Sequence, residues 1–117
     1  MTNENISVEN PDDGKMLRKF IDGSERNVAD LPSMYIGRGV YKPGWRWSTH
    51  AGVQTGKESA HHIGYVISGT MAVNGPTGKE EIINQGEAFE LSPNHDAWVV
   101  GDVSCVALDF EVKNETQ

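Results

Sequence analysis

The sequence has little cysteine, little positive charge and no long apolar run. Its single cysteine, Cys105, excludes an internal disulfide and a cysteine-based zinc cluster within one chain. No segment approaches the roughly 18 consecutive apolar residues that a membrane-spanning helix needs. The first residues, Met1 to Asn5, are polar and acidic and lack the basic and apolar regions of a secretion signal. Together these absences predict a cytoplasmic protein.

Basic residues are outnumbered: 10 Lys and Arg stand against 17 Asp and Glu, for a formal net charge of −7. A field of this sign repels phosphate backbones, and no basic cluster counteracts it locally, so nucleic-acid binding is disfavoured. The 117 residues, 37% of them hydrophobic, are typical of one globular domain. We expect a flexible acidic tail over residues 1–14, a single domain over 15–112 and a C-terminal tail over 113–117.

From Met34 onward, short segments rich in β-branched and aromatic residues alternate with turns that contain Gly, Pro and Asn. This pattern predicts strands at Met34–Tyr41, Trp45–His50, His62–Ser68, Met71–Asn74, Glu80–Asn84, Ala88–Leu91, Ala97–Val100 and Ser104–Glu111. Upstream, Lys15–Asp22 fits a short strand or a helical turn, and Gly23–Pro32 fits a loop. Because no sustained 3.6-residue stripe is present, the pattern indicates an all-β sandwich or barrel.

All four histidines fall between His50 and His95 and come from segments that a rolled sheet would bring together. Imidazole is the commonest metal ligand in proteins, and three imidazoles facing an open position make a standard metal site. Clustering alone is weak evidence, because a histidine at a strand end is often simply hydrogen-bonded to a neighbouring loop. The spacing of the histidines from nearby glycines strengthens the evidence for a metal site.

The first half of this window resembles the first motif of the cupin superfamily. Gly44 is followed after five residues by His50, which matches the first histidine of that motif, and the run into Gly69 resembles its end. Counting back over six residues from Gly69 puts His62 where the motif has glutamate. Gly52 stands where the second histidine belongs, so the motif is only partly kept.

The second half resembles the second cupin motif. Gly86 fits its start, and Pro93 and Asn94 fit its turn, with proline displaced by one residue and asparagine in place of glycine. Ala97 stands at the final histidine position. His95 lies two residues earlier, hence on the same face of a strand, and can serve instead.

The resemblance implies an all-β double-stranded β-helix, a cupin-like jelly-roll barrel. It also implies a divalent metal ion (iron, zinc, nickel or manganese) on His50, His62 and His95. A three-imidazole site leaves the charge of the ion uncompensated and favours an anionic ligand. We therefore expect Arg46 and Ser48, on the same face of their strand as His50, to hold a substrate carboxylate. A degenerate cupin that has lost its metal is the alternative.

Only one of His61 and His62 can point into such a barrel. The count to Gly69 favours His62, and a one-residue slip would reverse the choice. If the histidines face inward, strand parity sends Trp45, Trp47, Tyr65 and Trp98 outward. Either the segment Leu17–Ile21 or a second subunit would cover these rings, and single-domain cupins commonly dimerise, so we expect a homodimer. The alternative is that Trp47 or Trp98 lines the pocket.

Three functions are compatible with these residues. The first is an enzyme acting on a small organic molecule, of dioxygenase, isomerase or lyase type. The second is a non-catalytic module that binds or senses a small ligand, with or without metal. The third is a metal-free sugar or nucleotide-sugar isomerase, which requires Tyr41 or Tyr65 to point into the barrel. We also expect a mobile loop over residues 52–58 near the pocket mouth and an inert buried thiol at Cys105.

Overall fold

Strands are the main regular structure in the computed structural model, which describes residues 6–13, 15–52 and 61–113. The strands are β1 (Leu17–Lys19), β2 (Glu25–Asp30), β3 (Met34–Tyr41), β4 (His62–Ser68), β5 (Met71–Asn74), β6 (Glu80–Ile83), β7 (Ala88–Leu91), β8 (Asp96–Val99) and β9 (Cys105–Val112). Two short helical turns, η1 (Pro11–Asp13) and η2 (Trp47–Gly52), complete the described elements. The predicted all-β class is confirmed.

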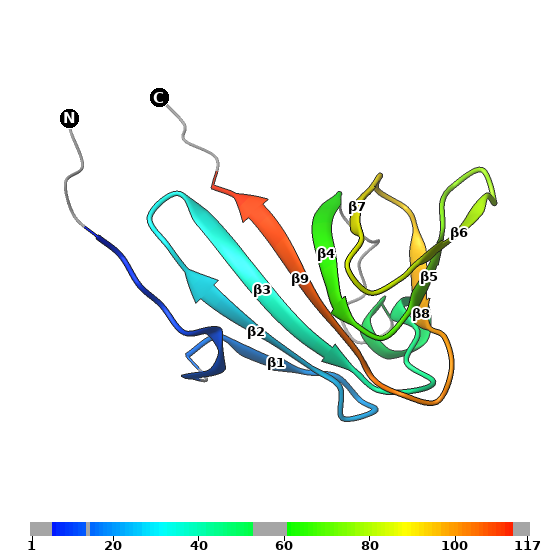
Figure 1. The fold of residues 1–117 in the computed structure, drawn as a ribbon, viewed down its shortest axis with the longest axis horizontal. Coiled ribbons are helices and arrows are strands. Elements are labelled where there is room, and N and C mark those ends of the chain that lie inside the picture. Colours follow the sequence, from blue (N-terminus) through cyan, green and yellow to red (C-terminus); the bar gives the residue numbers. More distant parts are fainter. Residues whose placement is uncertain (1–5, 14, 53–60, 114–117) are drawn as a thin grey trace.

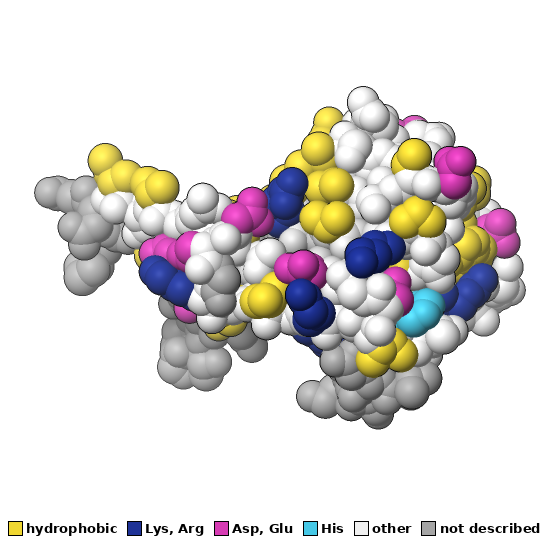
Figure 2. Space-filling model, turned by 90° about the horizontal axis from the view of Figure 1, so that it is seen from below, with side chains coloured by type: hydrophobic (Ala, Val, Ile, Leu, Met, Phe, Trp, Pro, Cys, Tyr) yellow, Lys and Arg dark blue, Asp and Glu magenta, His cyan; other side chains and the backbone are white. Residues whose placement is uncertain are grey.

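The strands form two antiparallel sheets. One has six strands in the order β1-β2-β3-β9-β4-β7, and the other has three in the order β6-β5-β8. Figure 1 shows β5, β6 and β8 gathered beside β4 and β7, while the far ends of β2 and β3 extend away from them. The molecule is therefore elongated, 45 × 30 × 29 Å, with a rounded body and a narrower arm (Figure 2).

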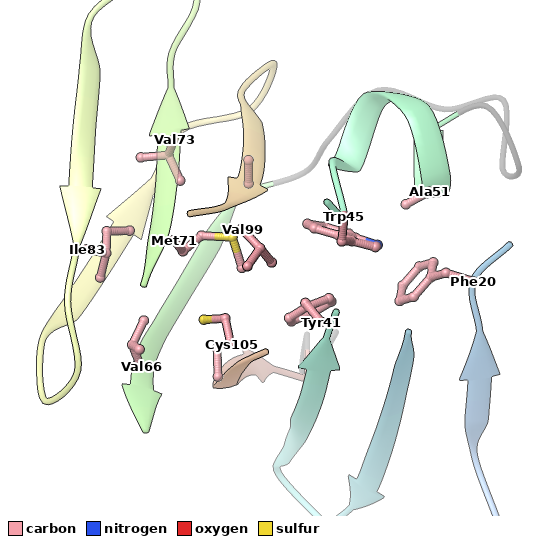
Figure 3. Packing of buried hydrophobic residues seen from close by; sticks show 12 residues of the cluster. Phe20, Tyr41, Trp45, Ala51, Val66, Met71, Val73, Ile83, Val99 and Cys105 are labelled. Carbon is pink, nitrogen blue, oxygen red and sulfur yellow. The ribbon is translucent and has the colours of Figure 1, made fainter. Parts of the chain in front are cut away.

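The core lies between the inner faces of the two sheets. Val66 and Cys105 are fully buried at its centre. Beside them the rings of Phe20, Tyr41 and Trp45 form an aromatic cluster (Figure 3), with centroids 6.1 Å apart for Phe20–Tyr41, 5.7 Å for Phe20–Trp45 and 4.5 Å for Tyr41–Trp45. Tilted and edge-on aromatic contacts of this kind add stability beyond the area that they bury.

Seven of the eight predicted strands are confirmed, each to within one residue at either end. The predicted strand over Trp45–His50 is wrong, because this segment turns into η2 instead. The Nδ1 atom of His50 accepts a hydrogen bond from the amide of Arg46 at 3.0 Å, and the His50 amide donates to the Arg46 carbonyl at 2.9 Å. These bonds close a turn that an extended strand cannot make.

The predicted loop over Gly23–Pro32 is also wrong, since most of it forms β2. Glycine and proline at its two ends indicate a loop, but all six residues of β2 pair in register with β3, and its first three also pair with β1. Tertiary pairing here outweighs a weak local β-propensity. The segment expected to form a strand or a helical turn, Lys15–Asp22, contains the short strand β1.

The predicted tails fall largely at the edge of what is described. Residues 1–5, 14 and 114–117 lie outside the described residues, as do residues 53–58 of the predicted mobile loop. Within the described part of the N-terminal segment, η1 lies near β3, where Asp12 pairs with Arg38 at 3.5 Å. None of the helices described is long and apolar enough to cross a membrane.

Candidate functional site

A cavity of about 480 Å³ opens between the two sheets. Its floor is apolar, with Met71, Val73, Ile83, Phe89 and Leu91 contributed by the strands of both sheets. Polar and charged side chains are confined to the surrounding walls. A concave, mostly apolar space with a few convergent polar groups is the usual form of a small-molecule site.

Two histidines lie side by side in this cavity. His62 begins β4 and points inward, whereas its neighbour His61 lies outside and contacts Glu90 at 2.7 Å. His95 precedes β8 and is 8% exposed. The His62 and His95 rings have centroids 5.4 Å apart and are nearly perpendicular, at 86°.

The turn before β8 fixes the orientation of His95. Asn94 has φ of 66°, a left-handed conformation that asparagine tolerates better than most residues, and it occupies the place of the motif's glycine. The Nδ1–H of His95 donates to the Ser92 carbonyl at 2.7 Å. In the neutral ring this bond puts the remaining lone pair on Nε2, so the tautomer is set by the turn.

Burial lowers the pKa of His62 below its ordinary value. The loss of hydration is the largest cause, the negative charge of Asp109 opposes it, and the neighbouring His95 and Arg26 reinforce it. At neutral pH the ring of His62 is therefore neutral and able to accept a proton.

The third predicted metal ligand, His50, is not among the residues that line the cavity. Its Nδ1 lone pair accepts the amide hydrogen of Arg46, so the neutral ring carries its proton on Nε2. The predicted substrate-binding residues Arg46 and Ser48 also lie away from the cavity lining. Arg46 pairs with Asp96 at 3.0 Å, and Ser48 donates to Asp96 from its hydroxyl at 2.8 Å and its amide at 2.9 Å.

Whether a metal ion fits this cavity depends on which side chains can act as ligands to it. Two imidazoles that share an ion at about 2.1 Å per bond have centroids roughly 4.5 to 6.5 Å apart, so His62 and His95 meet this condition. Among the described residues, however, no group of three His, Cys, Asp or Glu side chains is arranged to hold a metal. The described donors thus supply two ligands and not the predicted three, and metal binding through three histidines stays a prediction.

An ion pair crosses the cavity wall next to the histidines. The guanidinium of Arg26 on β2 makes two hydrogen bonds to the carboxylate of Asp109 on β9, at 2.9 and 2.7 Å. The strand between them carries Gly37, where a Cβ atom would collide with both side chains of the pair. Glycine at this position therefore leaves room for the ion pair, whose bidentate geometry holds both groups in place.

Aromatic side chains also line the cavity, which corrects the predicted parity. Trp45 and Trp47 line the cavity instead of facing outward, because the turn into η2 breaks the alternation of a strand. Tyr41 lines it as well, and burial, followed by the charge of Asp109, raises the pKa of its hydroxyl, which stays protonated. Tyr65 does face outward and is 41% exposed. Trp98 lies outside the cavity lining, under the Arg46 guanidinium at 4.3 Å.

Sequence reasoning missed the charged residues of the cavity. Arg26 lies in a segment whose pattern predicts a loop, and Arg18 in one that fits either a short strand or a helical turn, so strand parity could not place either side chain. Asp109 and Glu111 carried a usable signal, since they share a strand face with the apolar Cys105 and Ala107. Charged residues on the core face of a strand are unusual enough to indicate a site.

No family model matches the sequence, and no curated protein matches it. Solved structures do match the fold. KdgF from Halomonas sp. is 19% identical, with a TM-score of 0.65 over 95% of this chain and 97% of that one. A cupin-superfamily sugar phosphate isomerase from Silicibacter pomeroyi is 13% identical, with a TM-score of 0.65 over 87% of this chain and 73% of that one. An RmlC-like cupin from Shewanella frigidimarina is 16% identical, with a TM-score of 0.63 over 97% of this chain and 94% of that one.

These likenesses confirm the predicted cupin fold. At such identities they speak for the arrangement of the strands alone, since one scaffold carries many activities. The function has to be argued from the side chains in the cavity.

Proposed function

We propose that this cupin-fold chain is an enzyme of isomerase or lyase type that moves a proton on a small organic molecule held in the cavity. One observation carries the proposal: a neutral, half-buried imidazole, His62, lies in the same cavity as the protonated hydroxyl of Tyr41. A base and an acid held in a largely apolar space are the elements of general acid–base catalysis. Two of the proteins with a similar fold are named as a sugar phosphate isomerase and an RmlC-like cupin.

In this proposal each group has one task. The imidazole of His62 takes the proton from a carbon next to a carbonyl group, and the electron pair of that C–H bond forms the double bond of an enol. The carbonyl oxygen takes the proton of the Tyr41 hydroxyl. In an isomerisation the protonated His62 returns its proton to the former carbonyl carbon, and the hydroxyl proton of the first carbon goes back to the Tyr41 oxygen as the new carbonyl forms. In an elimination the leaving group departs, with the proton held by His62, from the carbon on the other side of the first carbon, while the original carbonyl re-forms and its proton returns to Tyr41. The apolar floor keeps water from competing for either proton.

The test is solvent exchange. The protein is incubated in D₂O with a panel of aldoses, ketoses and sugar acids, and ¹H NMR follows the loss of the signal next to each carbonyl. We expect exchange with at least one compound and a loss of about 10² to 10⁴-fold in rate for Tyr41→Phe and for His62→Gln. Matched controls are Tyr65→Phe and His61→Gln, whose side chains lie outside the cavity. Equal rates in Tyr41→Phe and Tyr65→Phe would remove Tyr41 from the mechanism.

A non-catalytic binding module is the second candidate, and the apolar floor of the cavity favours it. Such a floor binds a hydrophobic body well without any reaction. Tight binding of a compound with no exchange of its protons would select this function over the enzyme.

The sequence also predicts a divalent metal ion bound by His50, His62 and His95. Elemental analysis of protein made without a histidine tag tests this prediction. Because the lone pair of His50 Nδ1 already accepts a backbone amide, we expect His50→Ala to leave any metal content unchanged. We expect His62→Ala to abolish it. Loss of the metal in His50→Ala, with the fold intact by circular dichroism, would restore the three-histidine site.

A further inference from the structure

One end of the cavity carries a positive charge that its surroundings do not neutralise. Arg18 on β1 and Arg26 on β2 are direct register partners, and both line the cavity. Arg26 is neutralised by Asp109. Arg18 makes no ion pair with any described carboxylate, and its guanidinium lies over the Phe20 ring, 5.1 Å from the centroid. In a chain of net charge −7, an unneutralised arginine in the wall of a pocket is conspicuous.

The nearby acidic residues are already paired or distant. Glu25 pairs with Lys19 at 3.7 Å, on the other face of β1 and β2. Glu111 lines the cavity from β9, with β2 and β3 between it and β1. Within the described residues, neither carboxylate forms an ion pair with Arg18.

We propose that Arg18 binds the carboxylate of a small organic acid, the body of which lies along the aromatic wall toward His62 and His95. This inference rests on the proposed function and names the substrate class of the same cavity. The planar guanidinium matches a carboxylate with two parallel hydrogen bonds. Its contact with the Phe20 ring restricts the motion of the guanidinium, so less freedom is lost on binding.

Charge and size both favour a monoanion. Arg18 supplies one uncompensated positive charge, whereas a phosphate with nearly two negative charges would need further cations. The volume of about 480 Å³ lies in the lower part of the range for small-molecule sites and suits a molecule with one ring. Phe20, Tyr41 and Trp45 offer flat apolar faces for such a ring (Figure 3).

The test uses a matched pair of probes, benzoate and its neutral isostere benzamide. Each is titrated to 50 mM, roughly the range in which single-ring fragments saturate, into ¹⁵N,¹³C-labelled protein. Shifts of the Arg18 Nε–H signal and of the His62 and His95 ring signals are followed. We expect benzoate to move all three, and benzamide to move the Arg18 signal much less. In Arg18→Gln the apparent Kd of benzoate should rise about tenfold or more, the loss of a charged hydrogen-bonded pair.

Arg38→Gln is the matched control, because Arg38 pairs with Asp12 away from the cavity lining. It should leave the benzoate affinity unchanged. Three results would each overturn the carboxylate site. The first is an equal loss of benzoate affinity in both variants, and the second is equal binding of benzoate and benzamide. The third is no shift of the Arg18 signal at 50 mM, roughly the saturating range. If benzoate moves the histidine signals equally in wild type and Arg18→Gln, the cavity binds ligands and the Arg18 inference alone fails. If benzoate moves Arg18 but neither histidine, the carboxylate site holds and the proposed reaction at His62 loses its substrate.

Discussion

The chemistry of the cavity depends on single residues whose ionisation differs from that in water. His62 is the clearest case, because the loss of hydration on burial outweighs the charges around the ring and lowers its pKa. The structure pairs that neutral ring with His95, and the Ser92 carbonyl holds His95 in one tautomer. The protonation of both rings can therefore be measured without knowing the substrate.

We expect the ring of His62 to titrate below about 6.5, the ordinary value for histidine. Between the folded and unfolded pKa values the unfolded chain binds more protons. The free energy of unfolding should therefore fall as the pH drops from about 6.5 through the folded pKa of His62. ¹H–¹³C NMR of the ring gives the pKa, and denaturation from about pH 8 down to about pH 4 gives the slope. A midpoint above about 6.5 would contradict the burial argument, and His62→Gln should flatten the slope.

The Arg26–Asp109 pair makes a second prediction at this scale. Asp109→Asn leaves the Arg26 charge uncompensated in a wall where the two side chains are 22% and 14% exposed. We expect a loss of about 2–3 kcal/mol in the free energy of unfolding for this variant and for Arg26→Gln, and less than the sum for the double variant. Urea denaturation of the cycle measures the coupling. The control Arg38→Gln, at an exposed ion pair, should change the free energy of unfolding by less than about 0.5 kcal/mol. If the effects of Asp109→Asn and Arg26→Gln are strictly additive in the double variant, the Arg26–Asp109 interaction does not stabilise the fold.

At the scale of elements, η2 decides which aromatic residues face the cavity. The carboxylate of Asp96 accepts from the Ser48 amide, the Ser48 hydroxyl and the Arg46 guanidinium, so it joins β8 to the start of this turn. Burial alone would raise the pKa of Asp96, but these hydrogen bonds lower it overall. Arg46 and Ser48, which the sequence predicts to hold a substrate carboxylate, bind this internal carboxylate, and their role toward a substrate stays a prediction.

We expect Asp96→Ala to cost about 1–2 kcal/mol of stability, the usual range for losing a capping carboxylate. The emission of the tryptophans should shift to longer wavelength, because Trp45 and Trp47 beside η2 become more hydrated. In the wild type the stability that the ionised Asp96 contributes is fully present above about pH 3.9. It is lost as the pH falls through the folded pKa of Asp96, which is lower. Asp102→Ala, at an exposed bend, serves as the control; a change in it equal to that in Asp96→Ala would contradict the role given to Asp96.

The elements also show what the sequence could and could not predict. Strands such as β4 and β9 were predictable because alternation of apolar residues survives in them, and the count to Gly69 favoured the inward-facing His62. The turn at η2 was not, since its local Arg46–His50 bonds are joined by bonds to Asp96, 48 to 50 residues away. β2 was missed for the same reason, because its partners on β1 and β3 supply the order that its own residues lack. Arg46 and Ser48 were predicted from the parity of a strand that η2 replaces, and His50 from its spacing to Gly44. The roles given to these three residues stay predictions.

For the whole molecule, the sheets present an exposed apolar surface among the described residues. On the outer face of β4, Ile63, Tyr65 and Ile67 are 44%, 41% and 41% exposed. Register places Phe110 opposite Ile63 and Leu108 opposite Tyr65 on β9, so the row continues across two strands. Adjacent exposed apolar residues of this kind usually mark an interface.

We propose that two copies of the chain pack this face together about a two-fold axis, which would realise the expected homodimer. Light scattering coupled to size-exclusion chromatography should then give twice the monomer mass of 12.8 kDa. Tyr65→Glu should return the monomer, because in a two-fold interface each substitution places two carboxylates in apolar surroundings. Ile82→Glu changes a side chain that is 47% exposed on β6 of the other sheet and should leave the mass unchanged. If Ile82→Glu disrupts the dimer and Tyr65→Glu does not, the interface lies on the three-stranded sheet. If the wild-type protein is a monomer, neither sheet forms a dimer interface.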